Sequence, residues 1–415
     1  MSVNRRAMLA GVAGLGLSAA AGGMAAAQVE GLTRMTAGAV PISQAERLAR
    51  VAKAQSLMKA QGLSAVVIEP GASLTYFTGV QWRRSERVTA AVIPVEGDLL
   101  IITPFFEEPS VRESLAVPGE VRTWQEDEDP AGPVADWLKA RKLASGKIGV
   151  EESVRFFVSD GLARRLPNAT FVPGAPVIRG CRMIKSPAEL ALMQIAADVT
   201  IAAYRYTHSK VERGMRPSDI GAIMSKATAA LGGKPEFSMV LLGEAAAYPH
   251  GSGKPQEVRD REVVLMDCGC TVEGYQSDIS RTFVFGEPTA EQRKVWGEVA
   301  RGQQIAFETA KVGTAAGAVD DAVRRYYESL GYGPRYGLPG LSHRTGHGIG
   351  LEGHEPINFV HGEATKLAPG MCLSNEPGLY LPGKFGVRLE DCIHMTDAGP
   401  KWFSKPPPSI DNPMG

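Results

Sequence analysis

The pattern of apolar and polar positions predicts two consecutive α/β units in this chain. Ser43-Gln44-Ala45-Glu46 has the form of a capping box and begins a helix. Apolar runs bounded by glycine and proline predict strands. The expected order is a helix at 43–61, a strand at 65–68, a hairpin of 90–94 and 99–104, a helix at 134–144 and a strand at 147–150. These elements suit a domain at residues 40–180.

A second unit begins after the Pro/Gly-rich segment 173–180, which we expect to end the first domain. Ser186 has the position of an N-cap, Pro187 of the first helical residue and Glu189 of the third. The order that follows is helix 188–206, helix 217–231, hairpin 262–285, helix 290–311, helix 316–330 and strands within 371–395. Helices followed by strands occur twice, which predicts two similar halves facing each other across a cleft, in a domain at 187–405. The fold class is therefore α/β (α+β).

Two aspartates stand on the predicted hairpin 262–285. With Glu273-Gly274 as the turn, the register places Gly269 opposite Asp278 and makes Asp267 the diagonal neighbour of Asp278. Diagonal positions lie roughly 7 Å apart at Cβ, a gap that two carboxylates can close by sharing cations. The alternative is a solvent-facing hairpin with incidental acids.

Four of the seven histidines lie close together, and glycines separate the first three. They are His343, His347, His354 and His361. The glycines exclude a helical zinc motif and favour an extended segment that presents side chains to a ligand. Imidazole suits a transition metal, a proton transfer or the support of an oxyanion. A hydrogen-bonded structural role is the alternative, and we expect it for His208, His361 and His394.

Glu376 and Glu390 each stand alone inside an apolar, strand-like run. A buried carboxylate without a partner costs several kcal/mol, so each needs a nearby cation, and Arg388 can serve one of them. Together with Asp267, Asp278 and one neutral imidazole, they give a net charge of minus four, which two divalent ions neutralise. Charge balance therefore favours a dinuclear site.

Taken together, four segments resemble the pita-bread metallopeptidases, within them the Xaa-Pro dipeptidase (prolidase) and aminopeptidase P group. They are the stretch Asp267 to Asp278, His343-Arg-Thr-Gly-His347-Gly-Ile-Gly-Leu-Glu-Gly-His354-Glu355, Asn375-Glu376-Pro377-Gly378 and Arg388-Leu-Glu390. The resemblance covers residues 187–395 and places His250 where the family keeps a substrate-binding histidine. It extends more weakly, through Tyr76-Phe77-Thr78-Gly79, to a creatinase-like N-terminal domain. It implies a pita-bread catalytic domain with pseudo-two-fold halves.

The resemblance implies a role for each candidate residue. Two divalent metal ions would be held by Asp267, Asp278, His347, Glu376 and Glu390. A hydroxide bridging the ions would attack the peptide bond that precedes proline, and Glu376 would accept a proton. His250 and His354 would contact the substrate and the oxyanion, while His343 and Arg388 would shape the pocket.

The ligand types indicate which metal to expect, and the sequence departs from the family pattern at one position. Mostly oxygen ligands suit a hard or borderline ion, so Mn²⁺ is expected, with Co²⁺, Fe²⁺ or Zn²⁺ as alternatives. Gly353 stands where the family usually has a β-branched residue, which loosens the backbone next to His354. None of the five metal ligands is missing.

Several alternative functions occur on the same fold and compete with the peptidase interpretation. The main one is a metal-dependent lyase, or a C–N hydrolase, acting on a small non-peptide substrate, because fold does not fix the substrate. A metal-free, creatinase-like enzyme and a non-catalytic binding protein are disfavoured by the intact ligand set. A methionine aminopeptidase is disfavoured because those enzymes lack a large N-terminal α/β domain. A proline-containing peptide is therefore the expected substrate.

Charge and cysteine content bear on the partners. The 45 basic and 45 acidic side chains balance, which gives no reason to expect nucleic acid. The five cysteines lack the spacing of a zinc knuckle or a disulfide framework and are interpreted as buried thiols. Cys268 and Cys270 should face away from the two aspartates of the hairpin. The family tends to dimerise through its N-terminal domain, so a homodimer is expected.

Residues 1–27 form a separate prediction, a twin-arginine export signal. Asn4-Arg5-Arg6 precedes an uncharged Ala/Gly/Leu stretch, and Ala25-Ala26-Ala27 supplies the small side chains of a cleavage site. We expect a periplasmic protein without stable membrane insertion after removal of the signal. The alternative is an uncleaved signal that anchors the chain in the membrane.

Overall fold

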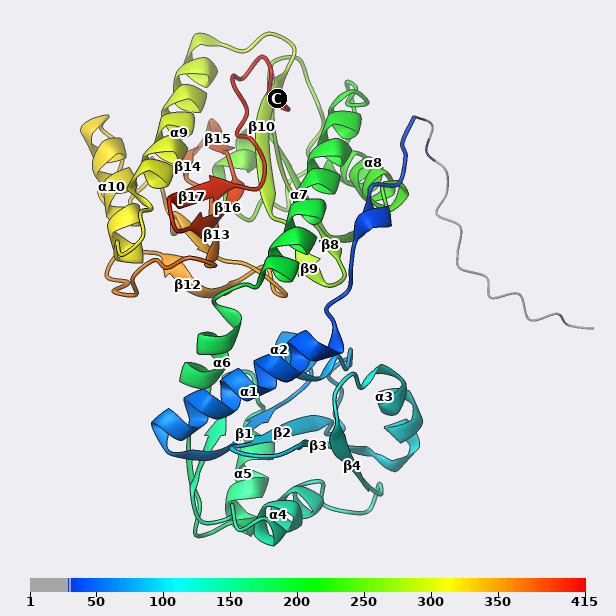
Figure 1. Cartoon of the computed structure of the whole chain (residues 1–415). Coiled ribbons are helices and arrows are strands. Elements are labelled where there is room, and N and C mark those ends of the chain that lie inside the picture. The colour runs from blue at the N-terminus through cyan, green and yellow to red at the C-terminus, as the bar shows by residue number, and fades with distance from the viewer. Residues whose placement is uncertain (1–28, 30) are drawn as a thin grey trace, which may run out of the picture.

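The computed structural model describes residue 29 and residues 31–415, so the predicted export signal lies outside the described residues. Figure 1 shows two lobes, with the blue-to-cyan N-terminal lobe below the green-to-red C-terminal lobe. Both lobes combine helices with sheets, which confirms the α/β (α+β) class expected from the sequence.

The N-terminal lobe is a six-stranded sheet in the order β4-β3-β2-β1-β5-β6, covered by helices on both faces. The strands are β1 (Leu63–Ile68), β2 (Ala90–Pro94), β3 (Leu99–Pro104), β4 (Gly119–Trp124), β5 (Lys147–Val150) and β6 (Thr170–Pro173). The helices are α1 (Gln44–Gln61), α2 (Ala72–Thr78), α3 (Glu108–Ser114), α4 (Ala131–Ala140), α5 (Phe156–Arg165) and α6 (Ala175–Arg182). One apolar cluster packs around Met58 and Phe77, and another around Trp137 on the opposite face.

One expectation for this lobe is wrong in detail. The helix placed at 134–144 is α4, which starts earlier because Asp129 Oδ1 accepts a hydrogen bond of 2.9 Å from the Ala131 amide. It also ends earlier, since Lys142 takes a positive φ of 59°. The segment 173–180, expected to end the first domain, runs from the last residue of β6 into helix α6, in whose first turn proline is tolerated.

The C-terminal lobe holds two sheets, β10-β8-β7 and β12-β11-β13-β16-β17, and a ribbon of β14 and β15. Its helices are α7 (Pro187–His208), α8 (Pro217–Ala230), α9 (Ala290–Thr309) and α10 (Ala316–Ser329). Its strands are β7 (Lys234–Leu242), β8 (Glu262–Val272), β9 (Tyr275–Gln276), β10 (Ile279–Phe285), β11 (Gly346–Gly348), β12 (Glu355–Phe359), β13 (Cys372–Asn375), β14 (Gly378–Leu381), β15 (Phe385–Arg388), β16 (Asp391–Thr396) and β17 (Gly399–Trp402). Figure 1 shows α7 and α8 on one side and α9 and α10 on the other, as the repeated element order predicts.

The hairpin that carries the two aspartates has the expected register. Cys268 pairs with Ile279, and Thr271 with Gln276, which leaves Asp278 opposite Gly269 in the short break between β9 and β10. The turn residues 273 and 274 have φ values of 50° and 84°, the left-handed values of a two-residue hairpin turn. All five cysteines are free and buried, as expected.

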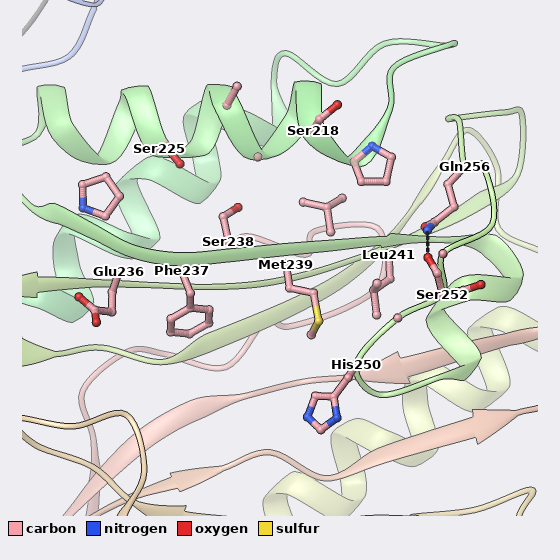
Figure 2. A pocket seen from close by; sticks show the side chains of 17 residues that line it. Ser218, Ser225, Glu236, Phe237, Ser238, Met239, Leu241, His250, Ser252 and Gln256 are labelled. Carbon is pink, nitrogen blue, oxygen red and sulfur yellow. Dashed lines mark hydrogen bonds between the residues drawn. The ribbon is translucent and has the colours of Figure 1, made fainter. Parts of the chain in front are cut away.

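Strand β7 is the outer edge of its sheet, and a groove of about 840 Å³ runs along it beside α8. Figure 2 shows Ser238 of β7 pointing toward α8, whereas Phe237 and Met239 point to the side where His250 lies. This alternation is that of an extended strand. One side of β7 thus faces the groove, and the other faces the candidate site described next.

Candidate metal centre

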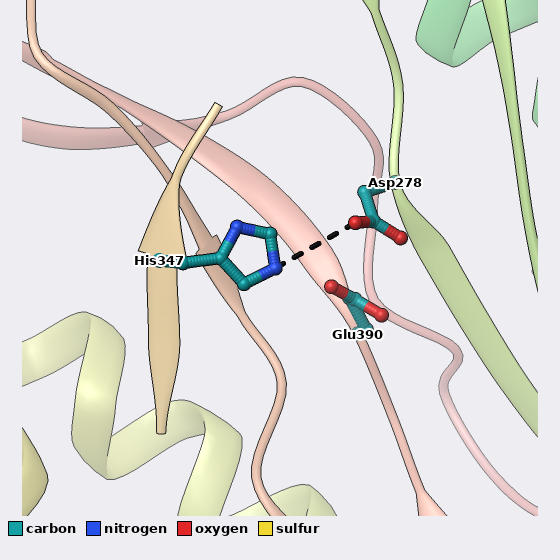
Figure 3. A group of neighbouring side chains, drawn as sticks. All are labelled: Asp278, His347 and Glu390. Atoms are coloured by element: carbon teal, nitrogen blue, oxygen red, sulfur yellow. Dashed lines mark ion pairs between the residues drawn. The ribbon is translucent and has the colours of Figure 1, made fainter. Parts of the chain in front are cut away.

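Three side chains from separate segments of the C-terminal lobe converge. Asp278 follows β9, His347 is the middle residue of β11, and Glu390 precedes β16. One ligand atom of each lies within 4.8 Å of the others, and all three residues are buried. Figure 3 shows the three side chains pointing toward one another. Two carboxylates and an imidazole in this arrangement suit a divalent cation.

His347 presents an unprotonated nitrogen to the acids. Its Nδ1 lies 3.0 Å from the Gly348 carbonyl oxygen, so Nδ1 carries the proton and Nε2 keeps its lone pair. That Nε2 lies 3.6 Å from Asp278 Oδ2 and 3.3 Å from Glu376 Oε1. Burial, followed by the charge of His354, lowers the pKa of His347 to about 3, which keeps the ring neutral. The His347 nitrogen and the carboxylate oxygens of Asp278 and Glu376 are all electron-pair donors and face one another, so a cation is the partner that they can share.

Two buried carboxylate oxygens at the same place lack a partner. Arg388 Nη2 donates to Asp267 Oδ2 at 2.6 Å, and Ser280 Oγ donates to Glu390 Oε2 at 2.8 Å. Among the described residues, nothing donates to the other oxygens, Asp267 Oδ1 and Glu390 Oε1. Buried acceptors left unpaired are costly, so these two oxygens fit a metal ion.

The carboxyl groups repel one another. Burial, then the charges of Asp267 and Glu376, raise the pKa of Asp278 well above its usual range. Burial, then Asp278 and Glu376, do the same to the pKa of Glu390. Burial raises the pKa of Glu376 to about 7, although the charge of Arg388 opposes the rise. The guanidinium groups of Arg388 and Arg344 do not balance four carboxylates, and divalent cations would.

All nine residues selected from the sequence line one cavity of about 470 Å³. They are Asp267, Asp278, His347, Glu376 and Glu390, with His250, His343, His354 and Arg388. The His354 ring lies 4.1 Å from the His347 ring between centroids, and His250 is exposed. The three histidines expected to be structural do not line this cavity; His361 Nδ1, for example, lies 2.7 Å from Asp321.

The two glutamates do not lie inside strands, which corrects the expectation for them. Glu376 comes directly after β13, and Glu390 comes directly before β16. The Glu376 amide donates to the Thr345 carbonyl at 2.9 Å, which continues the β11–β13 pairing by one more bond, whereas the Glu390 amide donates to the Ser280 carbonyl of β10, in the other sheet, at 3.1 Å. Side chains at such breaks are free of the strict alternation of a strand and can turn into the cavity.

Sequence reasoning missed a tyrosine that connects two of the candidates. Tyr380 Oη lies 2.7 Å from His343 Nε2, and Arg388 Nη1 donates to the same oxygen at 3.2 Å. His343 Nδ1 lies 2.7 Å from the Arg344 carbonyl, so that nitrogen donates and Nε2 accepts from the tyrosine. The chain of hydrogen bonds orients Arg388 toward Asp267. Gln276 and Arg344 also line the cavity and were not selected.

Two family models match the chain: Metallopeptidase family M24 over residues 191–397 and Creatinase/Prolidase N-terminal domain over residues 50–184. The probable dipeptidase PepE of Mycobacterium tuberculosis is 32% identical over 359 residues, which cover 84% of this chain and 92% of that protein. This chain belongs to metallopeptidase family M24. Its fold is therefore a creatinase-like N-terminal domain followed by an M24 catalytic domain, and the convergent acids and imidazole lie in the latter.

Other M24 relatives agree over nearly their full length. The Xaa-Pro dipeptidase of Lactobacillus helveticus is 32% identical, covering 80% of this chain and 90% of that protein. The solved dipeptidase PepE of Mycobacterium ulcerans gives a TM-score of 0.81 at 30% identity, covering 89% of this chain and 98% of that one. The prolidase of Thermococcus sibiricus gives 0.79 at 28% identity, covering 86% and 96%.

Within the part of the chain that the structure describes, no helix combines the length and the hydropathy needed to cross a bilayer.

Proposed function

We propose that this M24 metallopeptidase hydrolyses the peptide bond that precedes proline, as an Xaa-Pro dipeptidase or an aminopeptidase P. The observation that carries the proposal is the convergence of four carboxylates and a neutral imidazole in a cavity with three further histidines. Two buried oxygens of these carboxylates have no hydrogen-bond partner among the described residues. Relatives named Xaa-Pro dipeptidase and prolidase support the substrate class.

Two divalent cations are proposed for the five donor residues Asp267, Asp278, His347, Glu376 and Glu390. The four carboxylates match the charge of two cations, and the predominance of oxygen donors supports Mn²⁺. When bound, the cations supply the positive charge that polarises a carbonyl group and promotes loss of a proton from water.

The protein's own groups then bind the peptide and move protons. Glu376 accepts the proton of the attacking water, because burial raises the pKa of its carboxyl group to about 7. His354, whose ring lies 4.1 Å from that of His347 between centroids, donates to the developing oxyanion. His250 contacts the peptide from the exposed side of the cavity, and Tyr380 keeps His343 and Arg388 in place.

The test is hydrolysis of three peptides by the chain lacking residues 1–27, after metal removal and reconstitution with Mn²⁺. Ala-Pro and Ala-Pro-Ala-Ala separate dipeptidase from aminopeptidase action, and Ala-Ala is the matched peptide without proline. Cleavage before proline without cleavage of Ala-Ala supports the proposal. No cleavage of any peptide despite bound metal contradicts it and favours a lyase or C–N hydrolase of a small molecule.

We also propose export to the periplasm by the twin-arginine route. The support is the pair Arg5-Arg6 before an uncharged stretch that ends in Ala25-Ala26-Ala27. Replacement of both arginines by lysine should retain the protein in the cytoplasmic fraction, whereas the unchanged chain should appear in the periplasmic fraction. Equal distribution of the two proteins would contradict the proposal.

A homodimer formed through the N-terminal domain is proposed on an exposed aromatic patch. Phe105, Phe106, Phe156 and Phe157 are between 49% and 80% exposed. Arg87 packs on the Phe106 ring and Arg155 on the Phe157 ring, and Arg155 donates to the Arg87 carbonyl, so two neighbouring arginines connect Phe106 with Phe157. Exposed apolar patches mark association sites. Sedimentation should show a dimer that Phe156→Ser with Phe157→Ser dissociates.

A further inference from the structure

Arg344 lines the catalytic cavity but takes no part in the proposed metal site. It is partly buried and lies three residues before His347. Its Nη1 donates to Asn358 Oδ1 at 2.8 Å, and Asn358 pairs with His347 across β11 and β12. The guanidinium is therefore held on the same pair of strands that positions a metal ligand.

The backbone around Arg344 is fixed on both sides. Its carbonyl accepts from His343 Nδ1, and the preceding His343 carbonyl accepts from Arg324 Nη2 at 2.6 Å. On the other side, the amide and hydroxyl of Thr345 both donate to Asp320 Oδ1, at 3.1 and 2.7 Å. A side chain on such a backbone loses little conformational entropy when it binds a ligand.

Arg344 also carries a charge that nothing in the cavity balances. Arg388 pairs with Asp267 at 2.6 Å, whereas Arg344 forms no ion pair within the described part of the chain. Two divalent cations would neutralise the four carboxylates, which leaves the charges of both arginines in excess. The remaining lining acid, Glu236, is exposed, so solvent screens it. The loaded cavity therefore favours an anionic group on its ligand.

We propose that Arg344 binds the free C-terminal carboxylate of the substrate, which makes this a site for Xaa-Pro dipeptides. The inference rests on the proposed function. A guanidinium offers a planar fork of donors that matches a carboxylate, and only one of its donors is used by Asn358. In a dipeptide the carboxylate lies one residue beyond the scissile bond, inside the catalytic cavity. In a longer peptide the same position is a neutral amide.

Arg344 lines the same cavity as His354, the histidine that we place beside the scissile carbonyl. A longer peptide would have to continue elsewhere, and the groove along β7 shares Glu236, Phe237, Met239 and His250 with the cavity. Dipeptide and longer peptide thus make different demands on the molecule, which an experiment can separate.

The experiment compares Ala-Pro, its C-terminal amide and Ala-Pro-Ala on the Mn²⁺-loaded protein. We expect kcat/KM for Ala-Pro to exceed that for the amide by about 10- to 100-fold, the range of a hydrogen bond to a charged group. Arg344→Gln should lower kcat/KM for Ala-Pro to the value for the amide. It should change kcat/KM for the amide itself by less than about threefold. Arg301→Gln, which removes an exposed arginine of α9, is the matched control and should change kcat/KM for neither substrate.

A binding measurement that needs no turnover accompanies the kinetics. Calorimetry should show weaker binding of L-proline, but not of L-prolinamide, to Arg344→Gln. Equal cleavage of acid and amide by the unchanged protein overturns the inference, as does an equal loss for both in Arg344→Gln. Better cleavage of Ala-Pro-Ala than of Ala-Pro also overturns it and points to the β7 groove. Cleavage of none of the peptides is a different result, because it removes the proposed function and the inference with it.

Discussion

At the scale of single residues, the carboxyl group of Glu376 links metal binding to pH. Its pKa of about 7, and the raised pKa values of Asp278 and Glu390, mean that these groups hold protons near neutral pH in the metal-free protein. A cation must displace those protons, so Mn²⁺ affinity should rise between about pH 6 and about pH 8, by up to about tenfold per unit for each proton released. His347 is already neutral and releases none. Calorimetry in two buffers of different ionisation enthalpy counts the protons that are released when Mn²⁺ binds. A Mn²⁺ affinity that does not change with pH, with no proton release, would contradict the prediction.

The same scale shows what the sequence could and could not predict about the site. A lone acid in an apolar run demands a cation, so Glu376 and Glu390 were recognisable without a structure. Arg344 and Tyr380 were not, because an arginine in a glycine-rich loop or a tyrosine in a strand is ordinary there. Their position in or behind the cavity depends on hydrogen bonds to Asn358 and His343 that no local spacing encodes.

At the scale of elements, the close approach of β11 to β13 fixes His347. A Cβ added at Gly346 would lie 2.1 Å from the Ser374 carbonyl oxygen. Gly346→Ala should therefore push β11 outward, destabilise the fold by about 1–3 kcal/mol and weaken Mn²⁺ binding. Gly297→Ala in α9, where a Cβ meets nothing, is the matched control and should be neutral or slightly stabilising. Thermal unfolding and Mn²⁺ titration measure both effects, and an unchanged Mn²⁺ affinity in Gly346→Ala would refute this account of β11.

Elements with strong local chemistry were predicted well. The turn at Glu273-Gly274 set the register of the aspartate hairpin, and the capping box at Ser186 set the start of α7. Helix α6 was not predicted, because its proline and glycine were interpreted as the end of the first domain. Yet Val177, Ile178 and Cys181 bury one face of it against the N-terminal sheet, and that packing outweighs the composition.

At the scale of the whole molecule, Glu355 at the start of β12 ties the C-terminal lobe to the junction of the two lobes. Lys185, just before α7, donates to Glu355 at 2.8 Å, and Arg182 at the end of α6 pairs with it as well. Burial alone would raise the pKa of Glu355, but these two cations lower it to about 2. Glu355→Gln leaves them without a buried partner and should cost about 3 kcal/mol of stability.

Glu352→Gln is the matched control for that change, because Glu352 also pairs with Arg182 but is half-exposed. It should alter the free energy of unfolding by less than about 0.5 kcal/mol. Equal effects of the two substitutions in urea denaturation would show that Glu355 does not hold the junction. The sequence could not reveal this contact, since Lys185 and Glu355 are 170 residues apart and only the folded lobes bring them together.

The most direct test of the proposed metallopeptidase activity is hydrolysis of Ala-Pro as Mn²⁺ is added back to the metal-free protein. We expect activity to rise until two equivalents are bound. Asp278→Asn should abolish it by removing a ligand, and His354→Ala should lower kcat by about 10²- to 10⁴-fold while Mn²⁺ remains bound. Full activity without metal, or undiminished activity in both variants, would contradict the assignment of this cavity as the catalytic site.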